Sequence, residues 1–254
     1  MLIQEEITIP VLSGETPRRL FIWLPEEAEE SGDRYPVLYM FDGHNVFLDE
    51  TATYGRSWRM QDYLEEQALP LIVVGVECNH EGNRRLEEYS PFDARMAGTG
   101  RIRGQGNLTM DWLVDELKPA VDAHFPTQPE REHTAIAGSS MGGLMSLYAV
   151  TAYNQIFSMA AALSPSIWVA PNKLVEGIRN CPMERNTRVY MDYGTRELGN
   201  HNRQRMLRGL ERVYRTLLEK DCAACMRIVP GGTHSEASWE RQVPIFLRHL
   251  GLQE

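Results

Sequence analysis

The chain has 254 residues, and its 35 acidic and 26 basic side chains give it a formal net charge of −9 and a pI of about 5.4. This acidic balance excludes nucleic acid and an anionic membrane surface as expected partners, because each would need a basic face on the protein. There is no run of eighteen apolar residues that could span a membrane and no secretory signal at the N-terminus, so the expected location is the cytoplasm.

Hydrophobic patterning along the chain predicts an alternation of strands and helices. Strands are expected at residues 3–11, 19–24, 35–41, 71–78, 135–137, 157–163, 188–193 and 226–229. Helices are expected at residues 58–68, 110–125, 202–220 and 235–250, with a further helix that begins near Leu144. Residues 79–107 have no clean period, contain five glycines and five arginines, and are interpreted as a long functional loop.

The order of these elements predicts the fold class. The first two strands flank Gly14 and Pro17 and are typical of an antiparallel hairpin at a sheet edge. From residue 35 onward strands and helices alternate, which predicts an α/β fold with about eight mostly parallel strands and helices on both faces. A chain of this length with such a sheet is expected to form a single domain over residues 1–254.

A tight turn, Gly138-Ser139-Ser140-Met141-Gly142, lies between a short strand and a helix. Glycines two residues away on each side of Ser140 allow the strand and helix backbones to approach closely and leave Ser140 at the apex. The helix points unpaired N–H groups and its positive dipole end at the serine hydroxyl, where a tetrahedral oxyanion would need stabilisation. Ser140 is therefore the predicted nucleophile, and the alternative is a plain tight turn.

A serine of this kind needs a base and an acid. An imidazole must take the hydroxyl proton, and a carboxylate must fix the tautomer of the imidazole. Polar residues that follow parallel strands gather at one edge of the sheet, and His234 follows a glycine-rich loop after the last strand. Glu197 is the favoured acid because it lies in a loop beyond its strand, while Asp192 is the competing candidate still within that strand.

The four cysteines are too few and too irregularly spaced for a disulfide framework. Cys222 and Cys225 form a C-x-x-C pair, but a second ligand pair at matching spacing is missing, so the pair is interpreted as structural. No histidine, cysteine or carboxylate cluster has the spacing of metal ligands. The sequence therefore predicts neither a metal nor a cofactor.

Several motifs of the chain occur together in one known family. They are Tyr35-Pro36-Val37-Leu38-Tyr39, Gly138-Ser139-Ser140-Met141-Gly142-Gly143, Leu163-Ser164-Pro165-Ser166, Gly194-Thr195-Arg196-Glu197, and Gly231-Gly232-Thr233-His234 followed by Trp239. Over residues 18–250 the chain resembles the Putative esterase family of the α/β-hydrolase superfamily, which includes esterase D and S-formylglutathione hydrolases, feruloyl and acetylxylan esterases, enterochelin esterases and mycolyltransferases. The resemblance implies Ser140, Glu197 and His234 as the catalytic triad, in the chain order of that superfamily.

The chain departs from the family pattern after the third strand. Many members have His-Gly there, whereas this sequence has Asp42-Gly43-His44-Asn45, a variant that resembles the enterochelin-esterase-like branch. The resemblance implies that the oxyanion is held by two backbone N–H groups, those of Met141 and His44. A backbone donor should tolerate the changed side chains.

The predicted function is that of a cofactor-free serine esterase that works through an acyl-enzyme. The expected substrate is a small ester, such as an acetyl or feruloyl ester of a sugar or another alcohol. The alternatives are a siderophore lactone, an S-formylglutathione-type thioester, acyl transfer to an alcohol, and a non-catalytic binding module. Residues expected to bind substrate are Asn45, Asn79, Trp168 and Trp58. The sequence leaves homo-oligomerisation open.

Overall fold

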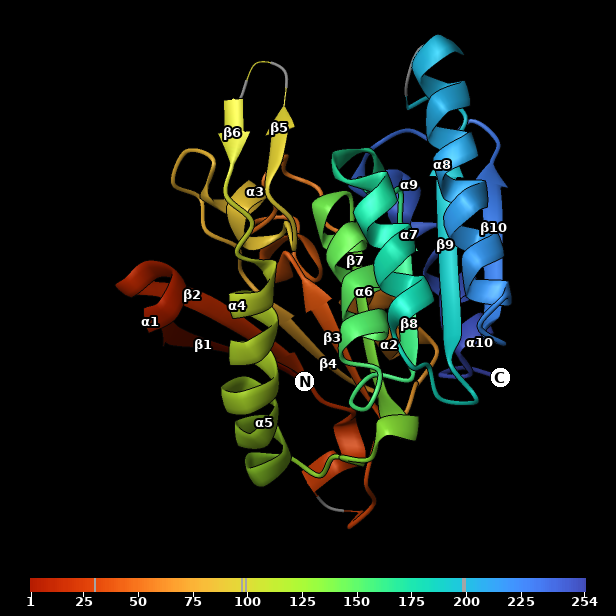
Figure 1. Ribbon diagram of the computed structural model, residues 1–254. Helices are drawn as coiled ribbons and strands as arrows, with labels where there is room; N and C mark the ends of the chain where they lie inside the picture. Colours follow the sequence, from red (N-terminus) through yellow and green to blue (C-terminus); the bar gives the residue numbers. More distant parts are fainter. Residues whose placement is uncertain (30, 97, 99, 198–199) are drawn as a thin grey trace.

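The computed structural model describes residues 1–29, 31–96, 98, 100–197 and 200–254. Within these residues the main sheet has eight strands in the order β1-β2-β4-β3-β7-β8-β9-β10 (Figure 1). The strands are β1 (Leu2–Ile9), β2 (Gly14–Trp23), β3 (Val37–Phe41), β4 (Ile72–Val76), β7 (Thr134–Ser139), β8 (Met159–Leu163), β9 (Arg188–Gly194) and β10 (Ala223–Val229). β2 pairs antiparallel with β1 and β4, and the remaining neighbours are parallel, which confirms the predicted fold class.

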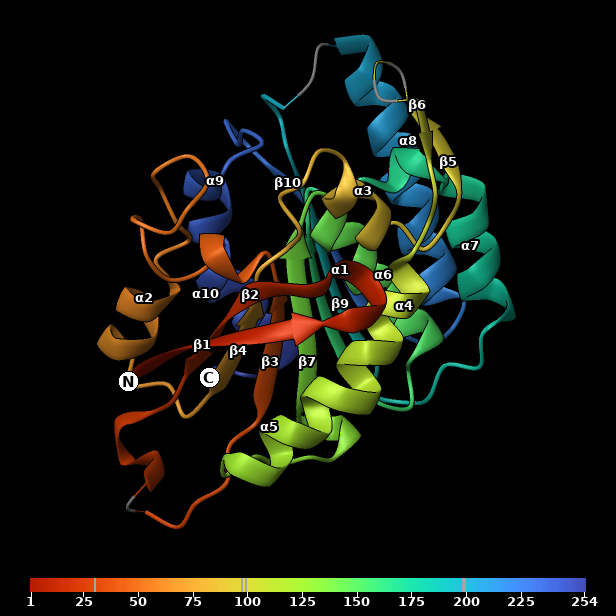
Figure 2. The same ribbon diagram turned by 90° about the vertical axis from the view of Figure 1, so that its left-hand side faces the viewer.

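Helices cover both faces of this sheet, with α4 to α8 on one side and α2, α9 and α10 on the other (Figure 2). The α-helices are α1 (Pro10–Ser13), α2 (Met60–Glu66), α3 (Arg84–Glu88), α4 (Gly106–Trp112), α5 (Lys118–His124), α6 (Met141–Ala152), α7 (Pro171–Asn180), α8 (Asn200–Leu218), α9 (Glu236–Glu240) and α10 (Val243–Leu250). Short 3₁₀ segments are η1 (Glu26–Glu29), η2 (Gly43–Asn45), η4 (Arg131–His133) and η5 (Ile167–Val169), and η3 (Leu113–Leu117) is π-helical. No helix among the described residues combines the length and the apolar character needed to cross a bilayer.

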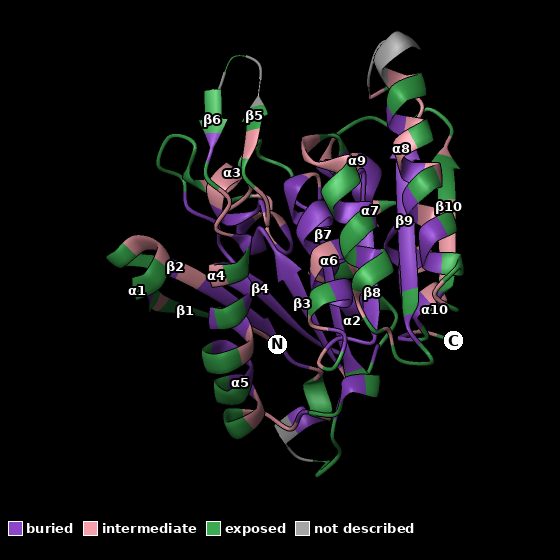
Figure 3. Cartoon of the chain, viewed as in Figure 1, coloured by how far each residue is buried: buried purple, intermediate pink, exposed green. Residues whose placement is uncertain are grey.

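The pleat of the central strands divides the core into two layers. In β3, Tyr39 and Phe41 pack into the cluster under α4 to α8, whereas Leu38 and Met40 pack into the cluster under α2 and α10. Successive side chains of a strand point to opposite faces, so an uninterrupted apolar run is what a strand covered on both sides requires. Figure 3 shows this arrangement as a buried sheet between helices whose outer faces are exposed.

Some predicted elements differ from the structure. The segment at residues 79–107 is not a plain loop, because it contains α3 and a hairpin of β5 (Ala94–Met96) and β6 (Gly100–Ile102). The sequence analysis missed α7 entirely. The helix expected at residues 235–250 is divided into α9 and α10, and Pro244 lies in the first turn of α10. Proline has no N–H, which does not matter in the first turn of a helix but would break a helix that continued through this position.

The parallel strands all end at the edge of the sheet that lies at the top of Figure 1. There β3 ends at Phe41, β7 at Ser139, β9 at Gly194 and β10 at Val229. The loops that follow these strands therefore meet at one edge, and they carry the candidate site residues.

Candidate active site

Ser140 occupies a strained turn between β7 and α6. Its backbone has φ 56° and ψ −117°, a region that residues with a side chain rarely adopt. The turn is held because the Ser140 N–H donates to the carbonyl of Leu163 at 2.9 Å and the Ser140 carbonyl accepts from the N–H of Ser166 at 2.8 Å. A Cβ at Gly138 would lie 2.8 Å from the backbone of Gly142, so the predicted need for glycine has a direct steric cause.

The loops after β9 and β10 pack backbone to backbone. The Arg196 N–H donates to the Gly232 carbonyl at 2.8 Å, and the Thr195 N–H donates to the Val229 carbonyl at 3.0 Å. Any side chain at Gly194 would overlap the backbone of Gly232, so this contact also depends on glycine. The close packing brings a carboxylate from one loop next to an imidazole from the other.

Glu197 and His234 form that pair. Nδ1 of His234 lies 2.9 Å from Oε2 of Glu197, whose side chain is 2% exposed, whereas that of His234 is 43% exposed. The other carboxylate oxygen accepts from the Gly194 N–H and from the Ser164 hydroxyl, both at 2.6 Å. A carboxylate oxygen accepts hydrogen bonds, so the contact between Oε2 and Nδ1 suits the tautomer that carries its proton on Nδ1, and Nε2 is then the ring nitrogen that can accept one.

Trp239 extends this network below the pair. Its indole N–H donates to the Ser164 hydroxyl at 2.9 Å, so the hydroxyl proton of Ser164 is directed to Glu197. The Trp239 ring also lies edge-on to the His234 ring, with centroids 5.1 Å apart and planes at 82°. Trp239 and Ser164 together fix the carboxylate and the imidazole from the buried side.

The Ser140 hydroxyl lies 3.3 Å from the hydroxyl of Ser166, and in the described part of the chain it makes no hydrogen bond to His234. Both Ser140 and His234 nevertheless line the same cleft. Hydrogen bonds between nucleophile and base are often long in ligand-free enzymes and tighten when substrate binds. The structure thus brings together the three residues that the sequence analysis singled out.

Asp192, the competing acid, does not face His234. It is 1% exposed within β9, and its carboxylate accepts from the Ser164 N–H at 2.9 Å and from the Tyr190 hydroxyl at 3.2 Å. Burial raises the pKa of Asp192 to about 7, well above the ordinary value of an aspartic acid. A neutral or half-ionised carboxyl inside the sheet is a structural group, and the geometry favours Glu197 as the partner of the imidazole.

The raised pKa of Asp192 predicts a pH-dependent stability. Below about pH 4 the carboxyl is protonated in both states, but between about pH 4 and 7 the unfolded chain releases the proton while the folded chain keeps it. The free energy of unfolding should therefore fall over this window, by up to about 4 kcal/mol. The side chain of Asp192→Asn cannot ionise. Urea denaturation at pH 5 and pH 8 should therefore show that the free energy of unfolding of the variant increases relative to that of the wild type as pH rises. Parallel pH profiles for the two proteins would contradict this account.

The two expected oxyanion donors lie at the starts of short helices. Met141 is the first residue of α6 and His44 lies in η2, so their N–H groups have no intrahelical acceptor. The start of α6 packs against the chain just before η2, since a Cβ at Gly142 would lie 3.0 Å from Cβ of Phe41 and 3.5 Å from Oδ2 of Asp42. The His44 side chain points elsewhere, with Nε2 3.0 Å from Oγ1 of Thr53, and burial lowers the pKa of His44 to about 4.

A cleft of about 900 Å³ opens beside Ser140. It is lined by Ser140, Ser164, Ser166, Ile167, Trp168, Pro171, Tyr193, Glu197, Arg205, Met206, Arg208, Gly209, Arg212 and His234. Trp168, which the sequence analysis expected to bind substrate, lines this cleft and is 44% exposed. The cleft is large enough for a drug-sized ligand.

The other residues expected to bind substrate do not line this cleft. Trp58 is 3% exposed and packs in the core against Trp239, with ring centroids 5.9 Å apart. The side-chain oxygen of Asn45 accepts from the N–H of Thr53, and that of Asn79 accepts from the N–H of Glu81. None of the three therefore lines this cleft. A position after a strand, as for Asn45 and Asn79, or at the start of a predicted helix, as for Trp58, does not determine the direction of a side chain.

The sequence analysis missed a group of arginines in the cleft wall. Arg205, Arg208 and Arg212 project from α8, and Arg212 donates to the side chain of Asn172 at 2.6 Å. Within the described residues, Arg205 and Arg208 have no acidic partner. The signal was available in the sequence, because three arginines at positions i, i+3 and i+7 of a helix share one face.

Among the described residues, the structure contains one group of potential metal ligands that no sequence motif indicated. The structure places the side chains of His44, Cys78 and His80 together, with one ligand atom from each no more than 4.8 Å from the others. These residues follow two different strands, β3 and β4, so inspection of local spacing could not detect the group.

The chain was compared with known proteins. Residues 13–250 match the family described as Putative esterase. The uncharacterised protein YbbA of Bacillus subtilis is 25% identical over 228 residues, which are 85% of this chain and 86% of that protein. The siderophore triacetylfusarinine C esterase of Aspergillus fumigatus is 30% identical over 147 residues, which are 56% of this chain and 48% of that protein. The matched region is therefore about half the length of the Aspergillus enzyme.

Solved structures support the fold. An IroE-like serine hydrolase from Shewanella oneidensis has a TM-score of 0.78 at 20% identity, covering 98% of this chain and 79% of that chain. The enterobactin esterase FES from Shigella flexneri has a TM-score of 0.72 at 19% identity, covering 98% and 59%. With a family match over nearly its whole length and this fold, the chain belongs to the Putative esterase family and is an esterase of the α/β-hydrolase superfamily.

Proposed function

We propose that the chain hydrolyses carboxylic esters with Ser140 as nucleophile, His234 as general base and Glu197 as the acid that orients the base. The observation that carries this proposal is the hydrogen bond of 2.9 Å between Nδ1 of His234 and Oε2 of Glu197 beside the strained Ser140 turn. With Nδ1 donating to the carboxylate, Nε2 is the atom that accepts the Ser140 proton. The buried carboxylate then stabilises the imidazolium that forms.

The reaction runs in two halves. The Ser140 Oγ attacks the ester carbonyl, and the oxyanion accepts hydrogen bonds from the backbone N–H groups of Met141 and His44. His234 passes its proton to the departing alcohol, which leaves an acyl-enzyme on Ser140. Water then attacks the acyl carbon while His234 takes its proton, and His234 returns that proton to Ser140 Oγ as the acyl–oxygen bond breaks and the acid leaves.

For the substrate, we infer an ester whose acyl part carries anionic groups. Arg205, Arg208 and Arg212 line the cleft beside the nucleophile, and Glu197 is the one carboxylate among the lining residues. Guanidinium groups bind carboxylates and other oxyanions through charge-assisted hydrogen bonds, whereas a neutral acetyl or feruloyl ester makes little use of them. Enterobactin, named for the Shigella relative, fits this chemistry better than a neutral sugar ester.

Replacing one cleft arginine tests the substrate class. Arg208→Gln should lower kcat/KM by about 10- to 100-fold for an anionic tris-catecholate lactone such as ferric enterobactin, because a charged hydrogen bond is lost. The same variant should hydrolyse the neutral ester 4-nitrophenyl butyrate at nearly the wild-type rate. Arg215→Gln is the matched control, since Arg215 lies on the same helix, does not line the cleft and pairs with Glu211 at 2.7 Å. Equal losses for both esters, or no loss for either, would contradict the anionic substrate.

A further inference from the structure

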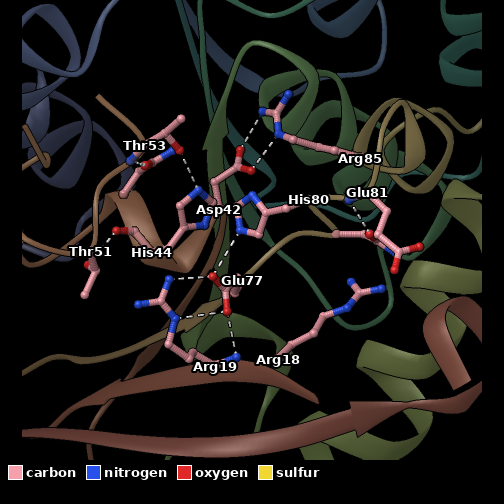
Figure 4. Close-up of polar contacts among 12 residues, drawn as sticks. Arg18, Arg19, Asp42, His44, Thr51, Thr53, Glu77, His80, Glu81 and Arg85 are labelled. Atoms are coloured by element: carbon pink, nitrogen blue, oxygen red, sulfur yellow. Dashed lines mark hydrogen bonds and ion pairs between the residues drawn. The ribbon is translucent and has the colours of Figure 1, made fainter. Parts of the chain in front are cut away.

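Two histidines and a cysteine, His44, Cys78 and His80, form a cluster that includes the side chain of the expected oxyanion donor His44. His44 follows β3, while Cys78 and His80 follow β4. β3 and β4 are adjacent parallel strands with Phe41 opposite Val76, so the residues after their ends lie side by side. Figure 4 shows the rings of His44 and His80 next to one another, and their centroids are 4.7 Å apart.

The donor atoms of this cluster lie close together. One ring nitrogen from each histidine and Sγ of Cys78 all lie within 4.8 Å of one another. His44 is 2% exposed, and its Nδ1 is buried with no hydrogen-bond partner within the described residues. A buried ring nitrogen without a partner is costly and is rare unless something is bound to it.

The Nε2 atoms of both histidines have hydrogen-bond partners, which leaves Nδ1 of each ring to bind a metal. Nε2 of His44 lies 3.0 Å from Oγ1 of Thr53, and Nε2 of His80 lies 3.0 Å from Oε1 of Glu77. Metal-bound histidines almost always donate their other ring N–H to a carboxylate or a similar acceptor, which orients the ring. Glu77 is itself held by the Arg19 guanidinium and backbone N–H, at 2.5–3.1 Å. Figure 4 shows both contacts as dashed lines around the cluster.

We propose that His44, Cys78 and His80 bind one Zn²⁺ ion, with a water molecule as the fourth ligand. Two imidazoles and a thiolate suit zinc and not magnesium or calcium, which prefer oxygen. Asp42 is not a ligand, because both its carboxylate oxygens accept from Arg85 at 2.7 Å. Binding breaks the S–H bond of Cys78, forms a sulfur–zinc bond and releases one proton to solvent.

The cluster is close to the geometry that zinc requires. Zinc–nitrogen and zinc–sulfur bonds of about 2.1 and 2.3 Å place tetrahedral ligand atoms about 3.5 Å apart, so the cluster must contract by about 1 Å. The His80 side chain is 55% exposed and can supply this movement. The bound ion would connect η2 to the segment after β4 and thereby fix the backbone of His44.

Cobalt titration of the chelator-treated full-length protein tests the site. One equivalent of Co²⁺ should produce a thiolate-to-cobalt charge-transfer band and strong visible bands of four-coordinate cobalt, and Zn²⁺ should displace both. Cys78→Ser should abolish the charge-transfer band, and His80→Gln should weaken cobalt binding by at least about 100-fold. Cys78 is buried, so the thermal midpoint of Cys78→Ser is measured to reveal whether that variant stays folded. His80 is exposed, so His80→Gln should stay folded and tests the site in either case.

Matched variants separate this site from incidental binding. Cys225→Ser removes a half-buried thiol of the C-x-x-C pair, and His124→Gln removes an exposed histidine, so both should leave the cobalt spectrum unchanged. No charge-transfer band in the wild type, or a band that is lost in Cys225→Ser and kept in Cys78→Ser, would overturn the proposal. Unchanged cobalt affinity in His80→Gln would overturn it too. None of these readouts depends on ester hydrolysis.

Discussion

Ser140→Ala should fold normally and lose ester turnover by at least about a thousandfold. Removing the nucleophile of a triad eliminates the acyl-enzyme route and leaves the oxyanion donors and the cleft, which together support a small residual rate. A thousandfold loss corresponds to about 4 kcal/mol of lost transition-state stabilisation. The measurement is kcat/KM for 4-nitrophenyl butyrate, together with thermal unfolding to verify that the fold is retained.

Ser139→Ala is the control for that experiment. Ser139 is the neighbouring serine of the same motif, but it ends β7 and does not line the cleft, so its variant should keep most of the activity. A fluorophosphonate should label the wild type and Ser139→Ala once each and should not label Ser140→Ala. Comparable turnover in Ser140→Ala would remove the basis of the proposed mechanism. Adding an alcohol acceptor to the wild-type assay distinguishes hydrolysis from acyl transfer, because only a transferase would form the new ester in preference to the acid.

Glu197→Gln should lower turnover by about two to four orders of magnitude with little change in stability. An amide N–H₂ facing Nδ1 of His234 would donate to it, so the imidazole would carry its proton on Nε2 and could not accept one from Ser140. The amide cannot escape by turning over, because its N–H₂ group would then face the Gly194 N–H that now donates to the carboxylate at 2.6 Å. Steady-state kinetics on the purified variant measures the loss.

Asp192→Asn provides the comparison for the acid. Asp192 lies within the sheet and bonds to the Ser164 N–H and the Tyr190 hydroxyl, so its neutralisation should change kcat by less than about tenfold. An exchange of the two results would identify Asp192 as the partner of the base. Small effects from both substitutions would leave Ser140 and His234 as a dyad and would refute the assignment of Glu197.

Some of this site follows from local sequence. The turn around Ser140 is specified by contiguous residues, because an apolar strand, glycines at positions 138 and 142 and a following helix leave few other backbone paths. The parallel sheet is likewise specified by the alternation of strand and helix patterns, since crossovers of that kind favour one handedness. For this reason the fold class and the tight turn at Ser140 could be predicted without coordinates.

The geometry that favours Glu197 over Asp192 depends on tertiary structure. The two residues are five positions apart, with Asp192 inside β9 and Glu197 beyond its end. What separates them is the packing of Gly194 on Gly232, which brings the loop of Glu197 next to that of His234. The misplaced Trp58, which packs in the core, shows the same limit. Position in the chain indicates which edge a residue reaches, but the direction of its side chain depends on neighbours from other strands.

Contacts between distant segments also bring together the arginines in the cleft wall and the ligands of the proposed zinc site. The arginines of α8 acquire a role only because α8 packs beside the Ser140 turn, and His44 meets Cys78 and His80 only because β3 and β4 are adjacent. The sequence by itself determined the Ser140 turn and the alternation of the main strands and helices, because neighbouring residues set the hydrophobic period there, but it did not reveal α3, α7 or the β5–β6 hairpin. Which side chains converge was decided by strand order and register, which arise from contacts between segments that are distant along the chain.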